Sequence, residues 1–118
     1  KYAEMSLYQQ ILLLKSWSKG LWAIENVVPY YNYLIEPNTM IGRHPYWTNF
    51  KVKPLSVKNI DVSRSTKEEL SEYLGLPIPR INGALLLRNS VEPKVGKHIF
   101  DCMLDKYNAD NITQEKLF

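Results

Sequence analysis

Only a few side chains in this chain are of the types that perform catalysis or bind metals, and their spacing does not bring them together. The two histidines, His44 and His98, are far apart in the sequence. His98 has Asp101 and Cys102 at the three- and four-residue spacing that helical metal ligands use. Cys102, however, lies on the expected apolar face of that helix, where a free cysteine is usually a small core residue. The five glycines are scattered and form no phosphate-binding loop. We therefore predict that the protein is not an enzyme and holds no metal or cofactor.

One stretch combines the two kinds of side chain that contact nucleic acid. From Arg43 to Lys53 the chain reads RHPYWTNFKVK, with cations that suit phosphates and aromatic rings that suit unpaired bases. Burying an aromatic ring stabilises a small domain strongly, so Trp47 and Phe50 are alternatively core residues. The stretch is thus either an exposed binding segment or part of the core.

The positive charges are concentrated in two blocks. The net charge is only +3, but residues 37–66 carry five cations against Asp61, and residues 77–100 carry four against Glu92. Two basic blocks separated by an acidic stretch are compatible with one positive face and a polyanionic partner, or with an ordinary solvated surface of mixed charge. The cations of the first block, which we expect to contact phosphates, are Arg43, Lys51, Lys53, Lys58 and Arg64.

The elements that must position these residues are mostly helical. Apolar residues at three- and four-residue spacing predict a helix over residues 3–19 and a second over 21–35 that kinks at Pro29. Residues 50–62 alternate, which predicts two short strands or an extended loop. The last amphipathic helix is expected to end at a turn over residues 108–111.

The clearest local signal is a helix over residues 67–74. Ser65 and Glu68 fit a capping box at its start, and Gly75 fits a cap at its end. Two prolines follow, after which residues 80–88 are predicted to form either a buried helix or a strand. A proline at the first turn favours the helix.

Residues 66–85, TKEELSEYLGLPIPRINGAL, resemble the helix-turn-helix unit of many repressors and sigma-like factors. The resemblance implies a three- or four-residue turn after the first helix, and a second helix whose first side chains enter the major groove of DNA. It also implies that Leu70, Leu74 and Ile81 are buried between the two helices. The side chains that the resemblance directs toward DNA are Arg80, Asn82 and Arg88.

Length and composition limit the remaining choices. At 118 residues the chain suits one domain of ordinary size, and its 45% apolar and 23% charged residues are those of a folded protein. A single cysteine excludes a disulfide framework, and no apolar run is long enough to span a bilayer. We predict a predominantly α-helical single domain over residues 1–118, with a small two-stranded β element near residues 50–62 and a helix-turn-helix-like unit. The missing initiator methionine suggests a domain taken from a longer intracellular protein.

These features predict macromolecular recognition. The leading hypothesis is a non-catalytic nucleic-acid-binding module, with DNA as the partner, in a larger intracellular regulatory or chromatin-associated protein that is nuclear if the source is eukaryotic. The rival hypothesis is a protein–protein interaction domain with an aromatic docking surface. Neither hypothesis involves a membrane, and the sequence leaves the oligomeric state open. The residues of the aromatic surface would be Tyr30, Tyr31, Tyr33, Tyr46 and Trp47.

Overall fold

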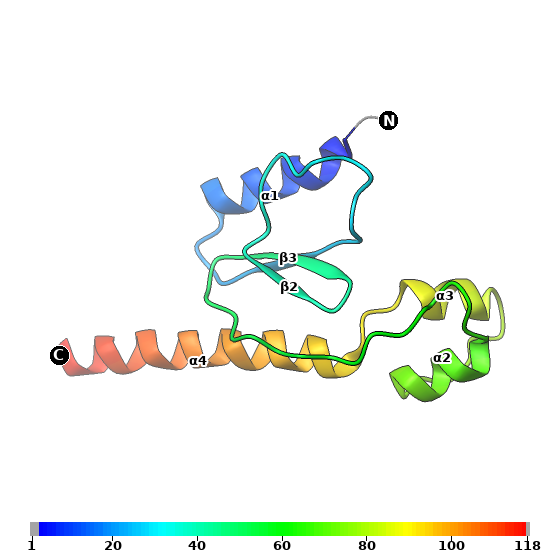
Figure 1. Cartoon of the computed structure of the whole chain (residues 1–118). Helices are drawn as coiled ribbons and strands as arrows, with labels where there is room; N and C mark the ends of the chain where they lie inside the picture. Colours follow the sequence, from blue (N-terminus) through cyan, green and yellow to red (C-terminus); the bar gives the residue numbers. More distant parts are fainter. Residues whose placement is uncertain (1–2, 118) are drawn as a thin grey trace.

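The computed structural model describes residues 3–117, with side chains through residue 112. A three-stranded antiparallel sheet lies between two helices, and a pair of shorter helices extends from one end (Figure 1). The helices beside the sheet are α1 (Met5–Trp17) and α4 (Pro93–Leu117), and the shorter pair is α2 (Lys67–Leu74) and α3 (Gly83–Asn89). The fold is a mixed α/β domain, so the predominantly helical fold that the sequence predicted is wrong.

The sheet begins in a part of the chain where a helix was predicted. Its strands are β1 (Ala23–Glu25), β2 (Thr39–Ile41) and β3 (His44–Thr48), in the order β1-β3-β2. The predicted helix over residues 21–35 is not formed, and residues 50–62 contain no strand. The β element therefore has three strands where two were predicted, and all three lie before residues 50–62 in the sequence.

The chain after β1 explains why the helical prediction for residues 21–35 fails. Tyr31, Tyr33 and Ile35 are half-buried against α1, whereas the residues between them are exposed. This two-residue period is that of an extended chain, and Pro29 has no N–H for a helical hydrogen bond. The apolar residues of this region fit both periods, so spacing alone did not distinguish them.

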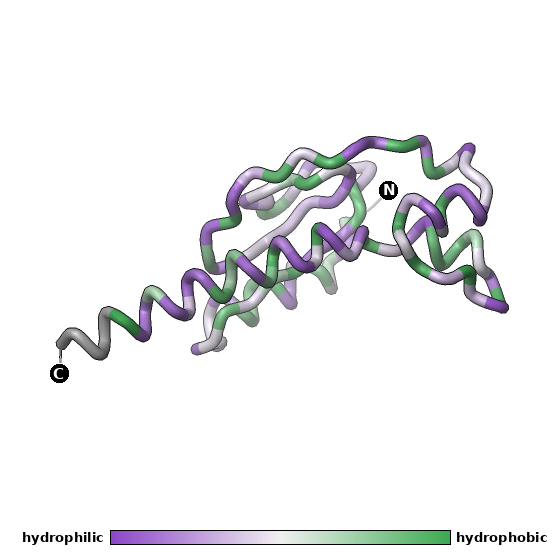
Figure 2. Tube along the Cα trace, turned by 90° about the horizontal axis from the view of Figure 1, so that it is seen from below, coloured by the Kyte–Doolittle hydropathy of each residue, from purple (hydrophilic) through white to green (hydrophobic). Residues whose placement is uncertain are grey.

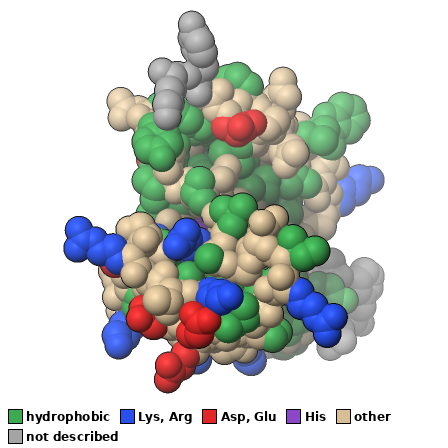
Figure 3. All heavy atoms as spheres, turned by 90° about the vertical axis from the view of Figure 1, so that its right-hand side faces the viewer, with side chains coloured by type: hydrophobic (Ala, Val, Ile, Leu, Met, Phe, Trp, Pro, Cys, Tyr) green, Lys and Arg blue, Asp and Glu red, His purple; other side chains and the backbone are tan. Residues whose placement is uncertain are grey.

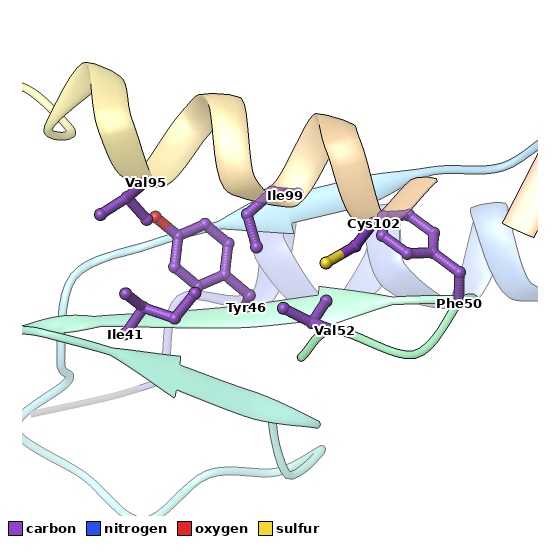
Figure 4. Packing of buried hydrophobic residues seen from close by; sticks show 7 residues of the cluster. All are labelled: Ile41, Tyr46, Phe50, Val52, Val95, Ile99 and Cys102. Carbon is purple, nitrogen blue, oxygen red and sulfur yellow. The ribbon is translucent and has the colours of Figure 1, made fainter. Parts of the chain in front are cut away.

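Successive residues of β3 point to opposite faces of the sheet and give each face its own core. Trp47 packs with α1, and Tyr46 packs with α4. The cluster beside α1 consists of Leu7, Tyr8, Ile11, Trp22 and Trp47. The cluster beside α4, drawn in Figure 4, consists of Ile41, Tyr46, Phe50, Val52, Val95, Ile99 and Cys102.

The chain that follows β3 runs alongside α4 without regular secondary structure (Figure 1). Val52 is buried in the cluster beside α4, and Leu55 and Val57 pack against the same cluster. Pro54 cannot donate to a strand ladder, which favours a loop here. The two predicted strands are therefore wrong, and the extended loop that the same alternation allowed is correct.

The helix α2 has the bounds that the sequence predicted but not the predicted cap. Its N-cap is Thr66, whose side-chain oxygen accepts a hydrogen bond from the N–H of Glu69 at 3.2 Å. The hydroxyl of Ser65 instead donates to the backbone carbonyl of Asp61 at 2.7 Å. Gly75 ends the helix with a φ of 68°, a left-handed conformation that glycine adopts without steric cost.

The connection between α2 and α3 is longer than the turn that the helix-turn-helix resemblance implies. It covers residues 75–82, and α3 begins only at Gly83. Two prolines in this connection lack N–H donors, which delays the second helix. Ile81 is 76% exposed, so its predicted burial is wrong, whereas Leu70 and Leu74 are buried as predicted.

The helix α4 is continuous over 25 residues, so the turn predicted at residues 108–111 is wrong. An ion pair of 2.9 Å between Lys106 and Asp110 spans one helical turn there. Seen from below, α4 passes along the domain and its C-terminal part projects beyond it (Figure 2). Among the residues that the structure describes, no helix is both long and apolar enough to cross a membrane.

Candidate nucleic-acid interface

The exposed side chains of Lys51, Lys53 and Lys58 define a lysine segment whose backbone is held at two points. Ring atom Nε2 of His98 donates to the carbonyl oxygen of Lys53 at 2.7 Å. The hydroxyl of Tyr73 donates to the carbonyl oxygen of Lys58. Apolar residues between the lysines pack beside α4. The three charges therefore stand on a fixed backbone, although that backbone is not a strand.

Carboxylates neutralise little of the charge on the lysine segment. Lys53 Nζ lies 3.7 Å from Asp105 Oδ2, and both side chains are more than half exposed. An exposed pair of this kind contributes little and is screened by salt. Within residues 3–112, Lys51 and Lys58 have no carboxylate at ion-pair distance. The lysine segment thus remains positively charged and open to solvent.

The two basic blocks of the sequence meet at Arg43 and Arg88. Arg43 Nη2 donates to the backbone carbonyl of Arg88 at 2.6 Å, and Arg88 Nε donates to that of Val62 at 3.2 Å. Both arginine side chains are half-buried, and carbonyl oxygens do not cancel their charges. Arg64, which follows Val62, is exposed and lies 3.4 Å from the carboxylate of Asp61. Arg43 and Arg88 therefore join parts of the fold besides adding positive charge.

A pocket of about 210 Å³ lies between the β2–β3 turn, the end of the lysine segment and the facing ends of α2 and α4. We call it the turn pocket. Arg43, Lys58, Tyr73 and Glu92 line it, together with His44. The hydroxyl of Tyr73 lies 3.2 Å from Glu92 Oε2. Burial, and then the negative charge of Glu92, raises the pKa of Tyr73, while the positive charge of Arg43 opposes this shift. The Tyr73 phenol therefore stays neutral and keeps the one proton that it donates to the Lys58 carbonyl.

Arg80 and Asn82 lie on the connection before α3 and not on a helix. Both are exposed, and Arg80 makes no ion pair with any described residue. The outward side chains of α3 include Leu85 and Leu86, which are 55% and 50% exposed and cannot hydrogen-bond to base edges. Figure 3, which faces this end, shows Lys and Arg side chains spread over it with acidic side chains among them. The helix α3 thus lacks the polar surface expected of a groove-reading helix.

Most of the aromatic rings singled out in the sequence are not on the surface. Tyr46 and Trp47 are buried in the two cores, so they offer no surface for base stacking or for docking. Tyr31 and Tyr33 are half-buried against α1, and Tyr33 meets the Trp47 ring edge-on at a centroid distance of 5.9 Å. Tyr30 is 90% exposed. The predicted aromatic docking surface is therefore largely part of the core.

A cluster of three polar groups was missed in the sequence because strand pairing creates it. Antiparallel pairing places Glu25 of β1 opposite Tyr46 of β3, on the face that also carries His44. His44 Nδ1 lies 2.8 Å from Glu25 Oε2, and the His44 side chain is only 8% exposed. Burial, with a further contribution from Glu25, raises the pKa of Tyr46 to about 12. Both ring nitrogens of His44 and the Tyr46 hydroxyl are buried without a hydrogen-bond partner among the described residues, so the short Nδ1–Glu25 contact is not a well-aligned hydrogen bond.

The residues at metal-ligand spacing on α4 have other partners. His98 Nε2 bonds to the Lys53 carbonyl, and Cys102 Sγ lies 3.8 Å from the same nitrogen. Asp101 pairs with Lys97 at 2.6 Å. In the described part of the chain, no group of three or more His, Cys, Asp or Glu side chains is arranged to hold a metal ion.

Comparison with known proteins gives no relative from which a function follows. No protein-family model, curated protein or solved structure matches the chain.

Proposed function

We propose that this protein binds nucleic acid, with duplex DNA as the partner, through the lysine segment and the cations beside it. The observation that supports this proposal is the position of Lys51, Lys53 and Lys58 on one exposed stretch of fixed backbone. The extended chain from Lys51 to Lys58 spans at most about 25 Å. Phosphates of one DNA strand rise about 3.4 Å per nucleotide along the helix axis, so several phosphates lie within this length.

The burial of the aromatic rings favours a duplex over a single strand. Proteins that bind single strands combine a positive groove with exposed rings on which bases stack. Tyr46 and Trp47, which adjoin the lysine segment in the sequence, are buried and unavailable for stacking. Contacts from lysines to phosphates need no unstacked bases and carry no sequence information. We therefore expect binding to depend weakly on sequence. We further propose an intracellular regulatory or chromatin-associated role, which would be nuclear if the source is eukaryotic.

A protein partner is the second candidate, and one surface favours it. The outer side of α1 exposes Leu12, Leu13 and Trp17, which are 54%, 58% and 79% exposed. Exposed apolar side chains that lie close together mark sites of protein contact. Because this surface is separate from the lysine segment, the L13S/W17S variant should leave DNA affinity unchanged if the lysine segment is the binding surface.

Fluorescence anisotropy with a labelled duplex tests the proposal. The K51A/K53A/K58A variant should bind the duplex at least about tenfold more weakly at low salt, because three phosphate contacts are lost. The matched control is K15A/K19A/K67A, which removes the same charge from exposed lysines elsewhere and should change affinity much less. Equal losses in the two variants would mean that net charge alone drives binding. Absence of binding by the unmodified protein would exclude the proposal.

A further inference from the structure

We propose that the turn pocket is a binding site for a phosphate group, which Arg43 and Lys58 attract and His44 contacts from the pocket wall. The pocket of about 210 Å³ is large enough for a phosphate group, and all three residues line it. A nucleic-acid backbone phosphate or a free phosphorylated compound would supply the same group. If the source is a nucleic-acid backbone, the inference rests on the proposed function; if it is a free phosphorylated compound, it does not.

The charges around the turn pocket favour an anion. Arg43 and Lys58 are the cations of its lining, and Glu92 is the one acid among the lining residues. The Tyr73 hydroxyl lies 3.2 Å from the Glu92 carboxylate but donates its one proton to the Lys58 carbonyl, so Glu92 keeps its charge and the two cations exceed it by one. Arg43 uses one guanidinium nitrogen to bond to the carbonyl of Arg88 and keeps further N–H donors for a ligand.

His44 supplies the observation that points to a ligand. Its side chain is more than nine-tenths buried, and its Nδ1 lies beside the Glu25 carboxylate at 2.8 Å. Both ring nitrogens are buried, and neither has a hydrogen-bond partner of good geometry among the described residues. Leaving such an atom unpaired costs free energy, and a ligand atom that hydrogen-bonds to it would remove this cost.

The turn beside the pocket is held in a fixed shape. Gly42 has a φ of 58°, and a Cβ built on it would lie 2.9 Å from Val57 Cγ2. The turn therefore packs tightly against the end of the lysine segment. This contact fixes the position of Arg43, the next residue along, before any ligand arrives. A site that needs little rearrangement loses less free energy on binding.

Titration with inorganic phosphate, followed by ¹H–¹⁵N NMR at constant ionic strength, tests the site. We expect saturable shifts of the Gly42, Arg43 and Lys58 amides and of the His44 ring nitrogens. Lys58→Gln should weaken phosphate binding about fivefold, since a charge-assisted hydrogen bond is lost at an open site. Lys53→Gln, an equal change of charge outside the pocket, should leave phosphate binding unaffected. Non-saturating shifts, or equal effects of the two variants, would overturn the proposal.

A second titration with a short DNA duplex identifies the source of the phosphate group. If the duplex shifts the same amides and competes with inorganic phosphate, the pocket holds a backbone phosphate. If phosphate saturates these amides but the duplex leaves them unaffected, the pocket serves a free phosphorylated compound. This holds whether or not the duplex binds elsewhere on the protein. Failure of duplex binding alone would thus contradict the proposed function and not the phosphate site. His44→Gln, checked by thermal unfolding, should abolish saturation by phosphate. It should leave duplex binding unchanged if the pocket serves a free phosphorylated compound, and weaken it if the pocket holds a backbone phosphate.

Discussion

The Arg43 guanidinium donates to the backbone carbonyl of Arg88 at 2.6 Å and so joins the sheet to the end of α3. Forty-five residues separate the two arginines in the sequence. Arg88 in turn bonds to the carbonyl of Val62, which lies before α2. The pair of shorter helices is therefore tied to the sheet domain by two arginines that were expected to contact DNA.

Removal of the Arg43 side chain should destabilise the fold. Arg43→Ala loses a charge-assisted hydrogen bond to a half-buried carbonyl, which is worth about 1.5–3 kcal/mol of unfolding free energy. Urea denaturation measures the loss. Arg80→Ala, a change at an exposed arginine without an ion pair in the described residues, should stay within about 0.5 kcal/mol. Equal stabilities of the two variants would show that the Arg43–Arg88 contact contributes nothing.

The small core of the shorter helices gives a second stability prediction. Leu74 is buried with Leu70 and Leu87. Leu74→Ala should lower the free energy of unfolding by about 2–5 kcal/mol because it leaves a cavity. Ile81→Ala removes a side chain that is 76% exposed and should change the free energy of unfolding by less than about 0.5 kcal/mol. A loss at Ile81→Ala as large as that at Leu74→Ala would support the tight helix-turn-helix packing that the sequence suggested, in which both side chains are buried.

The buried hydroxyl of Tyr46 gives a prediction about pH. Burial and Glu25 raise its pKa to about 12 from the model-compound value of 10.0. The neutral phenol is thus favoured by the fold, and this contribution is fully present below pH 10 and is lost as the pH rises toward 12. Urea denaturation from neutral pH to pH 11 should show a steeper loss of stability for the unmodified protein than for Tyr46→Phe.

The same variant has a neutral-pH outcome that follows from the missing hydrogen bond. Because the Tyr46 hydroxyl has no partner among the described residues, Tyr46→Phe removes a buried polar atom without breaking a bond. Its stability at neutral pH should equal or exceed that of the unmodified protein. A loss of more than about 1 kcal/mol would mean that the hydroxyl is hydrogen-bonded in solution.

The cap of α2 can be checked by two single substitutions. Thr66→Ala removes the side-chain oxygen that accepts from the Glu69 N–H and should cost about 1 kcal/mol. Glu68→Ala keeps the backbone arrangement and removes a first-turn carboxylate, so it should cost no more than about 0.5 kcal/mol. A larger effect of Glu68→Ala would favour the capping box that the sequence predicted at Ser65.

The sequence allowed prediction of those elements whose signals are local. The helix over residues 67–74 and its terminal Gly75 depend on neighbouring residues, and both are confirmed. The sheet depends on pairing between β1 and β3, whose residues are more than twenty positions apart. The apolar residues around β1 fit helical spacing as well as a strand, and only the pairing decides between the two.

The candidate site was predictable in part for the same reason. The exposure of Lys51, Lys53 and Lys58 follows from the alternation of apolar and charged residues, which is local. The contact between Glu25 and His44 follows from strand register and was not visible in the sequence. Trp47 was expected on the surface or in the core, and the core position arises because β3 is the central strand.

The salt dependence of duplex binding tests the central claim most directly. Each lysine–phosphate contact releases counterions and contributes about −0.9 to the slope of log K against log salt. The K51A/K53A/K58A variant should therefore have a slope shallower than that of the unmodified protein by about 2.7, whereas K15A/K19A/K67A should keep the original slope. Identical slopes for all three proteins would contradict the claim that the lysine segment contacts phosphates.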